Sequence, residues 1–527
     1  MHLQHDCETT SVSRDSASAL PGFHRSPDTI SLVKAGIAVS IFCAIACWVT
    51  GIWILVSTNG NIIRLLKGTE LGSEAITLLA GLILTFGSDT LGFVHATSLR
   101  WALYREGRLE YNTNFRLFTS SRTSFANHWY MNIWSTACLV LGYASLSLTL
   151  LPWTGGFNIA NGMALMFLGF AIFGQILIAA LCLRQHEAHI LTWSANPLTN
   201  TLAGLHGHSV LKRRPGRCML SVTEKDAPAH PSKPAATQPR LWRLRHVKWI
   251  VVFVWMFNFV WVGCAAGMVQ LLVAMEPTVD HFQFRWANNI DWTNVIYFGL
   301  NLFYWGDSIE LPVGTFAIQG FWAILFLVVI HGVQALGLHC VELLVNMSRD
   351  EQCWQQATRS KGAQMSSEPL LSVLNSWRTI LLTILKTVLH WTLGQSLAPQ
   401  YFLSGYDDPT DGSFVFSGGV IFFHISPSRL LIYSTCLSIT AIYTTILALW
   451  PVHSSQPVAW GHLQTLADLV DDWETKDGRI WWGDKGSNGL IRHAGTASYP
   501  EAVDEVLMGE DYAGRANCEE KRISPCR

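Results

Sequence analysis

Eight apolar stretches divide this chain, and they restrict its fold more than any other feature of the sequence. They cover Leu32–Leu55, Glu74–Thr97, Ile133–Leu151, Ala160–Leu183, Trp249–Met275, Val313–Leu338, Thr379–Leu397 and Leu430–Trp450. A helix needs about 20 apolar residues to cross a bilayer core, and most of the stretches reach that length. Half of all residues are hydrophobic and 14% are charged, against about 25% charged residues in soluble domains. The sequence therefore predicts an all-α fold, a polytopic membrane bundle of about eight transmembrane helices.

Lysine and arginine fall almost entirely in alternate connections between the stretches. Of the 36 Lys and Arg residues, 31 lie in the termini and in the second, fourth and sixth connections. Only 3 lie in the other connections, and Lys386 and Arg429 lie within or beside a stretch. Because basic residues accumulate on the cytosolic side, we expect both termini and the long loop 184–247 to be cytosolic. The pattern does not distinguish the plasma membrane from an endomembrane.

The seventh stretch, Thr379–Leu397, fits a span least well. It is short and contains Lys386 and His390. If it lies on the membrane surface as an amphipathic helix, the bundle has seven transmembrane helices and the C-terminal tail is outside.

The pattern predicts five regions along the chain. They are a disordered cytosolic N-terminus (1–31), a first four-helix membrane half (32–183), a basic cytosolic loop (184–247), a second four-helix membrane half (248–450) and a cytosolic tail (451–527). Within the basic loop, Pro and Ala are frequent over 226–238, which predicts a flexible linker. Two β-prone runs around Ser417-Gly418-Gly419 predict a small hairpin on the outer side. Apolar residues at helical spacing predict an amphipathic helix over 462–473.

Two spacings recur at equivalent places in the two halves. In each half a histidine precedes an arginine by ten residues, and a second histidine precedes a tryptophan by seven. The pairs are His95 with Arg105, His186 with Trp193, His339 with Arg349, and His453 with Trp460. These matches suggest a parallel four-plus-four duplication, as in some transporters. Since common residue types also match by chance, an unrepeated bundle is the alternative.

Several polar motifs resemble those of a known family. They lie in Leu99–Tyr111, Leu191–Pro197, Leu338–Glu351, Trp460–Trp473 and Arg492–Thr496. Together, and above all in the tail pattern GHLQTLADLVDDW followed by RHAGT, they resemble an uncharacterised fungal family of multi-pass membrane proteins. The resemblance spans most of the chain. It implies a membrane location and a fungal source, and it implies no activity.

Ionisable residues within the apolar stretches are the first candidates for a functional site. Asp89 lies near the middle of the second stretch, where a carboxylate costs about 2.5–3.5 kcal/mol on insertion scales. It is either an ion or proton site, or a structural carboxylate bonded to a neighbouring hydroxyl. Lys386 and His390, one turn apart, either pair with Asp89 or face water on an amphipathic helix. His339 and Glu342 stand at i and i+3, and their structural alternative is that Glu342 reaches headgroup water.

Other candidates lie in the basic loop. Its cluster Lys212, Arg213, Arg214 and Arg217 either grips anionic lipid headgroups or only directs topology. His186 and His189 have the side chains of metal ligands, but their spacing is not that of the His-Glu-x-x-His peptidases. We therefore predict no metal site, no catalytic residue and no cofactor.

Two functions remain compatible with the sequence. The first is a transporter or channel built around the intramembrane polar residues. The alternative is a membrane receptor or scaffold that recruits cytosolic partners through the loop 184–247 and the tail. An enzyme is less favoured, because the motifs of common hydrolases and nucleotide-binding enzymes are missing from the sequence. The expected partners are the lipid bilayer, including anionic lipids, and cytosolic proteins. A net charge of −1 gives no indication of a nucleic-acid partner.

Overall fold

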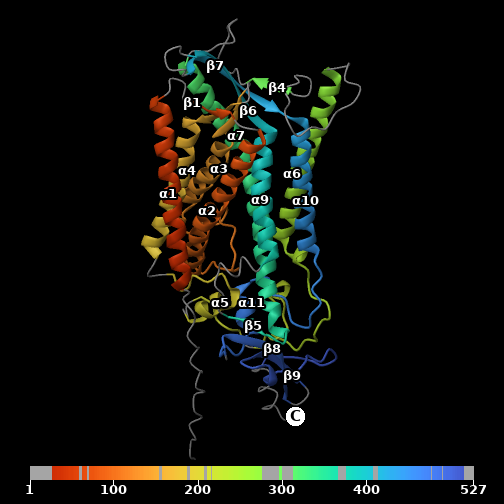
Figure 1. Ribbon diagram of the computed structural model, residues 1–527. Helices are drawn as coiled ribbons and strands as arrows, with labels where there is room; N and C mark the ends of the chain where they lie inside the picture. The colour runs from red at the N-terminus through yellow and green to blue at the C-terminus, as the bar shows by residue number, and fades with distance from the viewer. Residues whose placement is uncertain are drawn as a thin grey trace, which may run out of the picture.

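Each of the eight apolar stretches forms a long helix (Figure 1). The computed structural model describes residues 27–57, 62–67, 70–153, 157–186, 190–206, 210–214, 216–275, 296–299, 313–365, 376–407, 414–475, 477–488 and 491–514. The eight long helices are α1 (Pro27–Ser57), α2 (Glu70–Arg105), α3 (Trp129–Leu146), α4 (Gly162–His186), α6 (Arg245–Met275), α7 (Val313–Gln355), α9 (Trp377–Ser396) and α10 (Pro427–Leu449). The prediction of an all-α fold is therefore confirmed in part, because the described chain is mostly helical but also contains three small antiparallel sheets.

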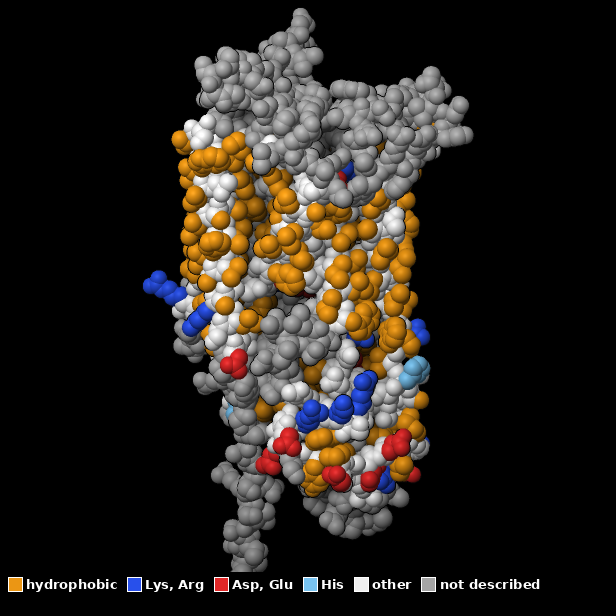
Figure 2. Space-filling view, in the orientation of Figure 1, with side chains coloured by type: hydrophobic (Ala, Val, Ile, Leu, Met, Phe, Trp, Pro, Cys, Tyr) orange, Lys and Arg blue, Asp and Glu red, His pale blue; other side chains and the backbone are white. Residues whose placement is uncertain are grey.

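Six of these helices, α1, α2, α4, α6, α7 and α10, are long and apolar enough to cross a membrane. Their outward side chains form an apolar band across the face of the molecule that Figure 2 shows. In this band Phe42 is 73% and Phe259 61% exposed. Soluble proteins rarely expose so continuous an apolar surface, so the architecture is that of a multi-pass membrane protein. The helices α3 and α9, with 18 and 20 residues, are the shortest of the eight and are not among the six.

The long helices and two small sheets follow one order of elements twice. The first half, residues 27–206, contains β1 (Ile62–Lys67), β2 (Leu150–Trp153) and β3 (Phe157–Asn161), with β1 after α1 and the β2–β3 hairpin between α3 and α4. The second half, residues 245–469, contains β4 (Ile296–Gly299), β6 (Leu397–Asp407) and β7 (Phe414–Ile425), with β4 after α6 and the β6–β7 hairpin between α9 and α10. The antiparallel sheets have the equivalent strand orders β1-β3-β2 and β4-β7-β6.

Helix packing repeats in the same way. In the first half α4 packs against α1, α2 and α3, and in the second half α10 packs against α6, α7 and α9. Between the halves, α2 contacts α9 and α3 contacts α7. This exchange of equivalent helices is what a two-fold relation produces. We call α2, α3, α7 and α9 the inner helices, because they form the interface between the halves.

The hairpin predicted around Ser417–Gly419 is real, but its turn was misplaced. Gly418 and Gly419 lie within β7, opposite Ser404 and Leu403 of β6. Residues 408–413, which connect β6 to β7, lie outside those described. Glycine usually marks a turn, whereas here the two glycines adjoin the irregularity in strand register at Ser404 and Gly405.

A compact basal domain lies at the end of the molecule where α1 begins and the described chain ends (Figure 1). It contains α5 (Pro197–His206), α11 (Leu463–Leu469) and a sheet of β5 (Ala363–Gln364), β8 (Arg479–Asn488) and β9 (Ile491–Ala497) in the order β5-β8-β9. The ends of α2 and α7 enter its core, where Trp101 and Trp354 are buried with Leu466 and Tyr512. With 43 residues, α7 is about 65 Å long, so it extends well beyond a bilayer core of about 30 Å.

The segments that the sequence predicts to be cytosolic are more ordered than their composition suggests. The predicted linker 226–238 is held at Ser232, whose backbone pairs with Tyr512, and at Gln238, whose N–H donates to Val452. The predicted tail helix over 462–473 is shorter, since α11 ends at Leu469. Residues 1–26 of the expected disordered N-terminus lie outside the described part of the chain, and α1 begins at Pro27.

Candidate functional site

Lys386 joins three of the inner helices through two ion pairs. Its ammonium Nζ, on α9, lies 3.0 Å from Asp89 Oδ1 on α2 and 3.0 Å from Glu342 Oε2 on α7. The Lys386 side chain is 8% exposed, whereas Asp89 and Glu342 are 40% and 33% exposed. A charge inside a helix bundle needs a counter-charge, and here each charge has one. The structural alternative for Asp89 was a hydrogen bond to a neighbouring hydroxyl. In the structure its partner is instead the ammonium group of Lys386.

Two further basic groups surround this cluster. His339 Nδ1 lies 3.1 Å from Glu342 Oε2, one turn earlier on α7. Arg116, from the loop after α2, packs so closely on Gly92 that a side chain at that position would collide with its guanidinium. Burial lowers the pKa of Arg116, while the carboxylates of Glu342 and Asp89 oppose this effect. We call Asp89, Glu342, Lys386, His339 and Arg116 the charged cluster.

The loop that carries Arg116 is organised by Glu106. Its carboxylate accepts hydrogen bonds from Ser121 Oγ at 2.6 Å and Thr123 Oγ1 at 2.9 Å. The backbone N–H groups of Arg122 and Thr123 also donate to it. Burial alone would raise the pKa of Glu106, but these bonds and Arg108 outweigh it and lower the pKa to about 2. The loop is therefore held by an ionised carboxylate at neutral pH.

A histidine pair lies close to Lys386 at the centre of the inner helices. His331 of α7 and His390 of α9 face each other with their Nδ1 atoms 3.2 Å apart. Such a contact requires one ring to donate and the other to accept, so the pair holds a proton between the two rings. On the other side, His331 Nε2 lies 3.3 Å from Oγ of Ser147, the C-cap residue of α3. The ring of Tyr143 stacks on His390 with centroids 3.6 Å apart.

The polar core continues through hydroxyl groups of the inner helices. Tyr143 Oη lies 3.1 Å from Thr85 Oγ1 of α2, and Thr387 donates to Thr85 at 3.5 Å. All four inner helices therefore contribute polar side chains at this level. His390 is one turn along α9 from Lys386, which brings the histidine pair next to the charged cluster.

A third ion pair lies further along the same interface. Arg429 Nη2 of α10 is 2.7 Å from Glu74 Oε1 of α2, and both side chains are almost fully buried. Arg429 also donates to Gln395 of α9 at 3.1 Å. From Lys386 to Gln395 the rise along α9 is about 14 Å. Polar groups thus follow α9 at three levels, in a position to bind cations or pass protons along the interface.

Sequence reasoning identified part of this arrangement. It named Asp89, Lys386, His390, His339 and Glu342, and the structure brings all five to neighbouring levels of one interface. It missed His331, although a histidine inside an apolar stretch was a visible signal. It also missed the pair of Glu74 with Arg429, which lie at the start of the second apolar stretch and directly before the eighth.

The sequence motifs that carry the family resemblance meet in the basal domain. Glu351 accepts the backbone N–H groups of Ala459 and Trp460 at 2.9 and 2.6 Å, which ties α7 to the tail. Asp350 accepts from Asn112 at 2.9 Å. In the tail, Asp471 lies 2.8 Å from His493 Nε2 and accepts the backbone N–H of Thr496. These motif residues hold segments together, which is a structural role.

The remaining candidates are the basic cluster of the loop and the two histidines near the end of α4, and they do not form one site in the described part of the chain. Arg214 and Arg217 bind Asp468 of α11 at 2.6 and 3.4 Å, so they join the basic loop to the tail, while Lys212 and Arg213 are exposed. His186 is the last residue of α4, and His189 lies outside the described residues. In the described part of the chain, no group of three His, Cys, Asp or Glu side chains is arranged to hold a metal ion.

In comparisons with protein-family models, curated proteins and solved structures, nothing matches this chain.

Proposed function

We propose that the protein is a membrane transporter that moves protons, or a small cation coupled to protons, through the interface between its two halves. The observation that carries the proposal is the bridge from Lys386 to Asp89 and Glu342. Ionisable groups within transmembrane segments are costly and are typical of ion paths and proton relays. Both carboxylates are partly exposed, which supports access of water or of a cation to them without unfolding of the bundle.

The histidine pair supports protons as the transported or coupled ion. Histidine is the side chain that gains and loses a proton near neutral pH. His331 and His390 lie between the hydroxyl of Ser147 and the charged cluster, so a proton leaving Lys386 or a carboxylate has an adjacent acceptor. Protonation of Asp89 or Glu342 would release Lys386 from one partner and thereby loosen the contact between α2, α7 and α9.

The same proposal includes eight transmembrane helices. Two of them, α3 and α9, are not among the six that length and composition identify as candidate spans. Each leads into a hairpin at the end of the molecule opposite the basal domain (Figure 1). Lys386 does not argue against a span, because its charge is paired inside the bundle. By the distribution of basic residues we place the basal domain and both termini in the cytosol.

The receptor or scaffold alternative has less support. The loop and the tail that would recruit partners bind each other, through Arg214 with Asp468 and through Ser232 with Tyr512. We still propose cytosolic protein partners and anionic lipids around the protein, because of the basic loop and the tail. We also propose a fungal source, because of the family resemblance.

Proton flux into proteoliposomes that contain a pH-sensitive dye tests the proposal. After a pH step, the wild-type protein should carry protons, and Asp89→Asn should reduce the rate by more than about tenfold. A matched control is Glu110→Gln, which neutralises a carboxylate paired with Lys225 on the surface and should leave the rate unchanged. A wild-type rate no higher than that of empty liposomes, at every pH gradient and membrane potential applied, would refute the proposal.

A further inference from the structure

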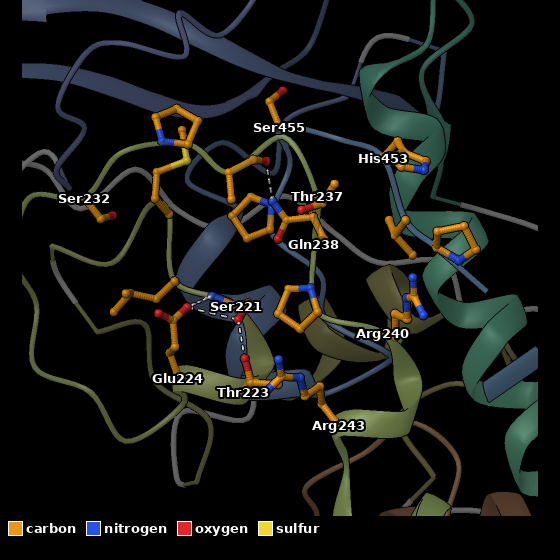
Figure 3. A pocket seen from close by; sticks show the side chains of 18 of the residues that line it. Ser221, Thr223, Glu224, Ser232, Thr237, Gln238, Arg240, Arg243, His453 and Ser455 are labelled. Carbon is orange, nitrogen blue, oxygen red and sulfur yellow. Dashed lines mark hydrogen bonds between the residues drawn. The ribbon is translucent and has the colours of Figure 1, made fainter. Parts of the chain in front are cut away.

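A cleft of about 930 Å³ lies in the basal domain, outside the interface between the halves (Figure 3). Its walls come from two segments that are distant in sequence, residues 219–243 and residues 449–457. Hydrophobic lining is provided by Leu220, Trp242 and Leu449, and hydroxyl groups by Ser221, Thr237 and Ser455. This volume is in the range of small-molecule sites, which are usually apolar clefts with a few convergent polar groups.

The cleft carries an excess of positive charge without counter-charges. Lys233, Arg240 and Arg243 line it, all three are exposed, and no described residue forms an ion pair or a side-chain hydrogen bond with them. Among the described lining residues, Glu224 is the one carboxylate. It is already engaged, because it accepts from the backbone N–H of Ser221 at 3.1 Å and from its hydroxyl at 3.0 Å. In Figure 3, Arg240 and His453 lie on one side of the view and Arg243 lies near its lower edge.

Two candidate membrane spans end at this cleft. Leu449, the last residue of α10, lines it, and Arg243 stands two residues before the start of α6. The helices α6 and α10 pack against each other, so the cleft opens where they leave the apolar band. It is therefore at the level where lipid headgroups meet water.

We propose that this cleft binds a phosphate-bearing anion, either the headgroup of a membrane lipid or a soluble phosphate ester. The planar guanidinium group of arginine matches the geometry of phosphate oxygens, and the two arginines and the lysine that line the cleft carry enough charge for more than one phosphate. The proposal is independent of transport, since it uses none of the residues between the halves.

Binding of a fluorescent phosphoinositide to the full-length protein in phosphatidylcholine nanodiscs tests the inference. Replacing both arginines, as Arg240→Gln with Arg243→Gln, should weaken binding by more than about tenfold. The matched control is Arg359→Gln with Lys361→Gln, which removes the same charge from exposed positions outside the cleft and should change affinity by less than about twofold. A third variant, Ala235→Trp, keeps every charge but fills the cleft, and it should also lose binding.

Competition with inositol trisphosphate separates the two sources of phosphate. If the soluble compound displaces the lipid with similar affinity, the ligand is a free phosphate ester, and if it does not, the ligand is a lipid headgroup. Absence of saturable binding to either probe overturns the proposal. Equal losses in the cleft variant and the control variant also overturn it, because they would show attraction to general charge.

Discussion

At the scale of single residues, the unusual feature is a lysine with two carboxylates inside an apolar bundle. Lys386 is the shared partner of Asp89 and Glu342. Removing the charge of any one of the three therefore changes the charge compensation of the other two. Removing the cation leaves two carboxylates close to each other, with His339 and Arg116 as the nearby basic side chains among the described residues. Removing one carboxylate leaves the lysine with its second partner. The two kinds of variant should therefore differ in stability.

We expect Lys386→Met to destabilise the protein by about 1–3 kcal/mol, because it leaves two partly exposed carboxylates without their counter-charge. Asp89→Asn should cost less, since Lys386 stays paired with Glu342. The double variant should cost less than the sum of the two, as expected for side chains in direct contact. Reversible unfolding of the purified protein in mixed detergent micelles measures these differences.

The surface pair of Glu110 with Lys225, at 3.3 Å, provides the control cycle. Exposed ion pairs contribute little, so Glu110→Gln and Lys225→Met should be additive within about 0.5 kcal/mol. Additive effects of Asp89→Asn and Lys386→Met would contradict the ion pair in the bundle.

At the scale of elements, one carboxylate joins the end of α11 to the β8–β9 hairpin within the basal domain. Asp471 follows α11 and binds three residues of the β8–β9 hairpin, namely His493, Thr496 and Lys485. Gly495 lies directly under this carboxylate, where a Cβ atom would overlap with the Asp471 side chain. The RHAGT and VDDW patterns are therefore complementary parts of one joint between a helix and a hairpin.

Gly495→Ala should separate this joint and destabilise the basal domain by about 1–3 kcal/mol, the usual cost of overpacking. Gly509→Ala is the control, because nothing lies within 4 Å of a Cβ at Gly509. Hydrogen exchange of β8 and β9 measures the effect locally. Equal protection of the strands in the two variants would show that Asp471 moves aside at no cost.

At the scale of the whole molecule, the proposed transport depends on two halves that exchange equivalent helices across an interface. The contacts of α2 with α9 and of α3 with α7 place the charged cluster and the histidine pair where relative movement of the halves would change their distances. An odd number of spans would break this arrangement, because the two halves would then enter the membrane differently.

A C-terminal tag should therefore stay intact when protease is added to the outside of intact cells, as should a tag inserted in the exposed stretch beside Lys212. A tag placed between Asp407 and Phe414 should be cleaved, because the β6–β7 hairpin lies at the opposite end of the bundle from the basal domain. Cleavage of the C-terminal tag in intact cells would show that α9 does not span, and it would return the count to seven.

Local sequence patterns determined the long helices, because apolar runs of membrane length leave the backbone no partner except itself. All eight stretches became helices, with ends displaced by up to 17 residues in α7, where Leu338 was predicted and Gln355 is observed. The sequence also identified five ionisable residues within these apolar runs as candidates, because a charge inside a membrane span is costly unless it is paired or functional. They are Asp89, Lys386, His390, His339 and Glu342.

Only the tertiary structure decided which of these groups meet. Asp89 and Lys386 are 297 residues apart in sequence, and no local spacing relates them. Their contact follows from the exchange of α2 and α9 between the halves, as the contact of His331 with Ser147 follows from that of α7 and α3. The same holds for the end of α11 and for the ordered segment 226–238. The backbone hydrogen bonds of both segments are made to residues that are distant in sequence. Local sequence patterns predict local conformation, but they do not predict such long-range partners.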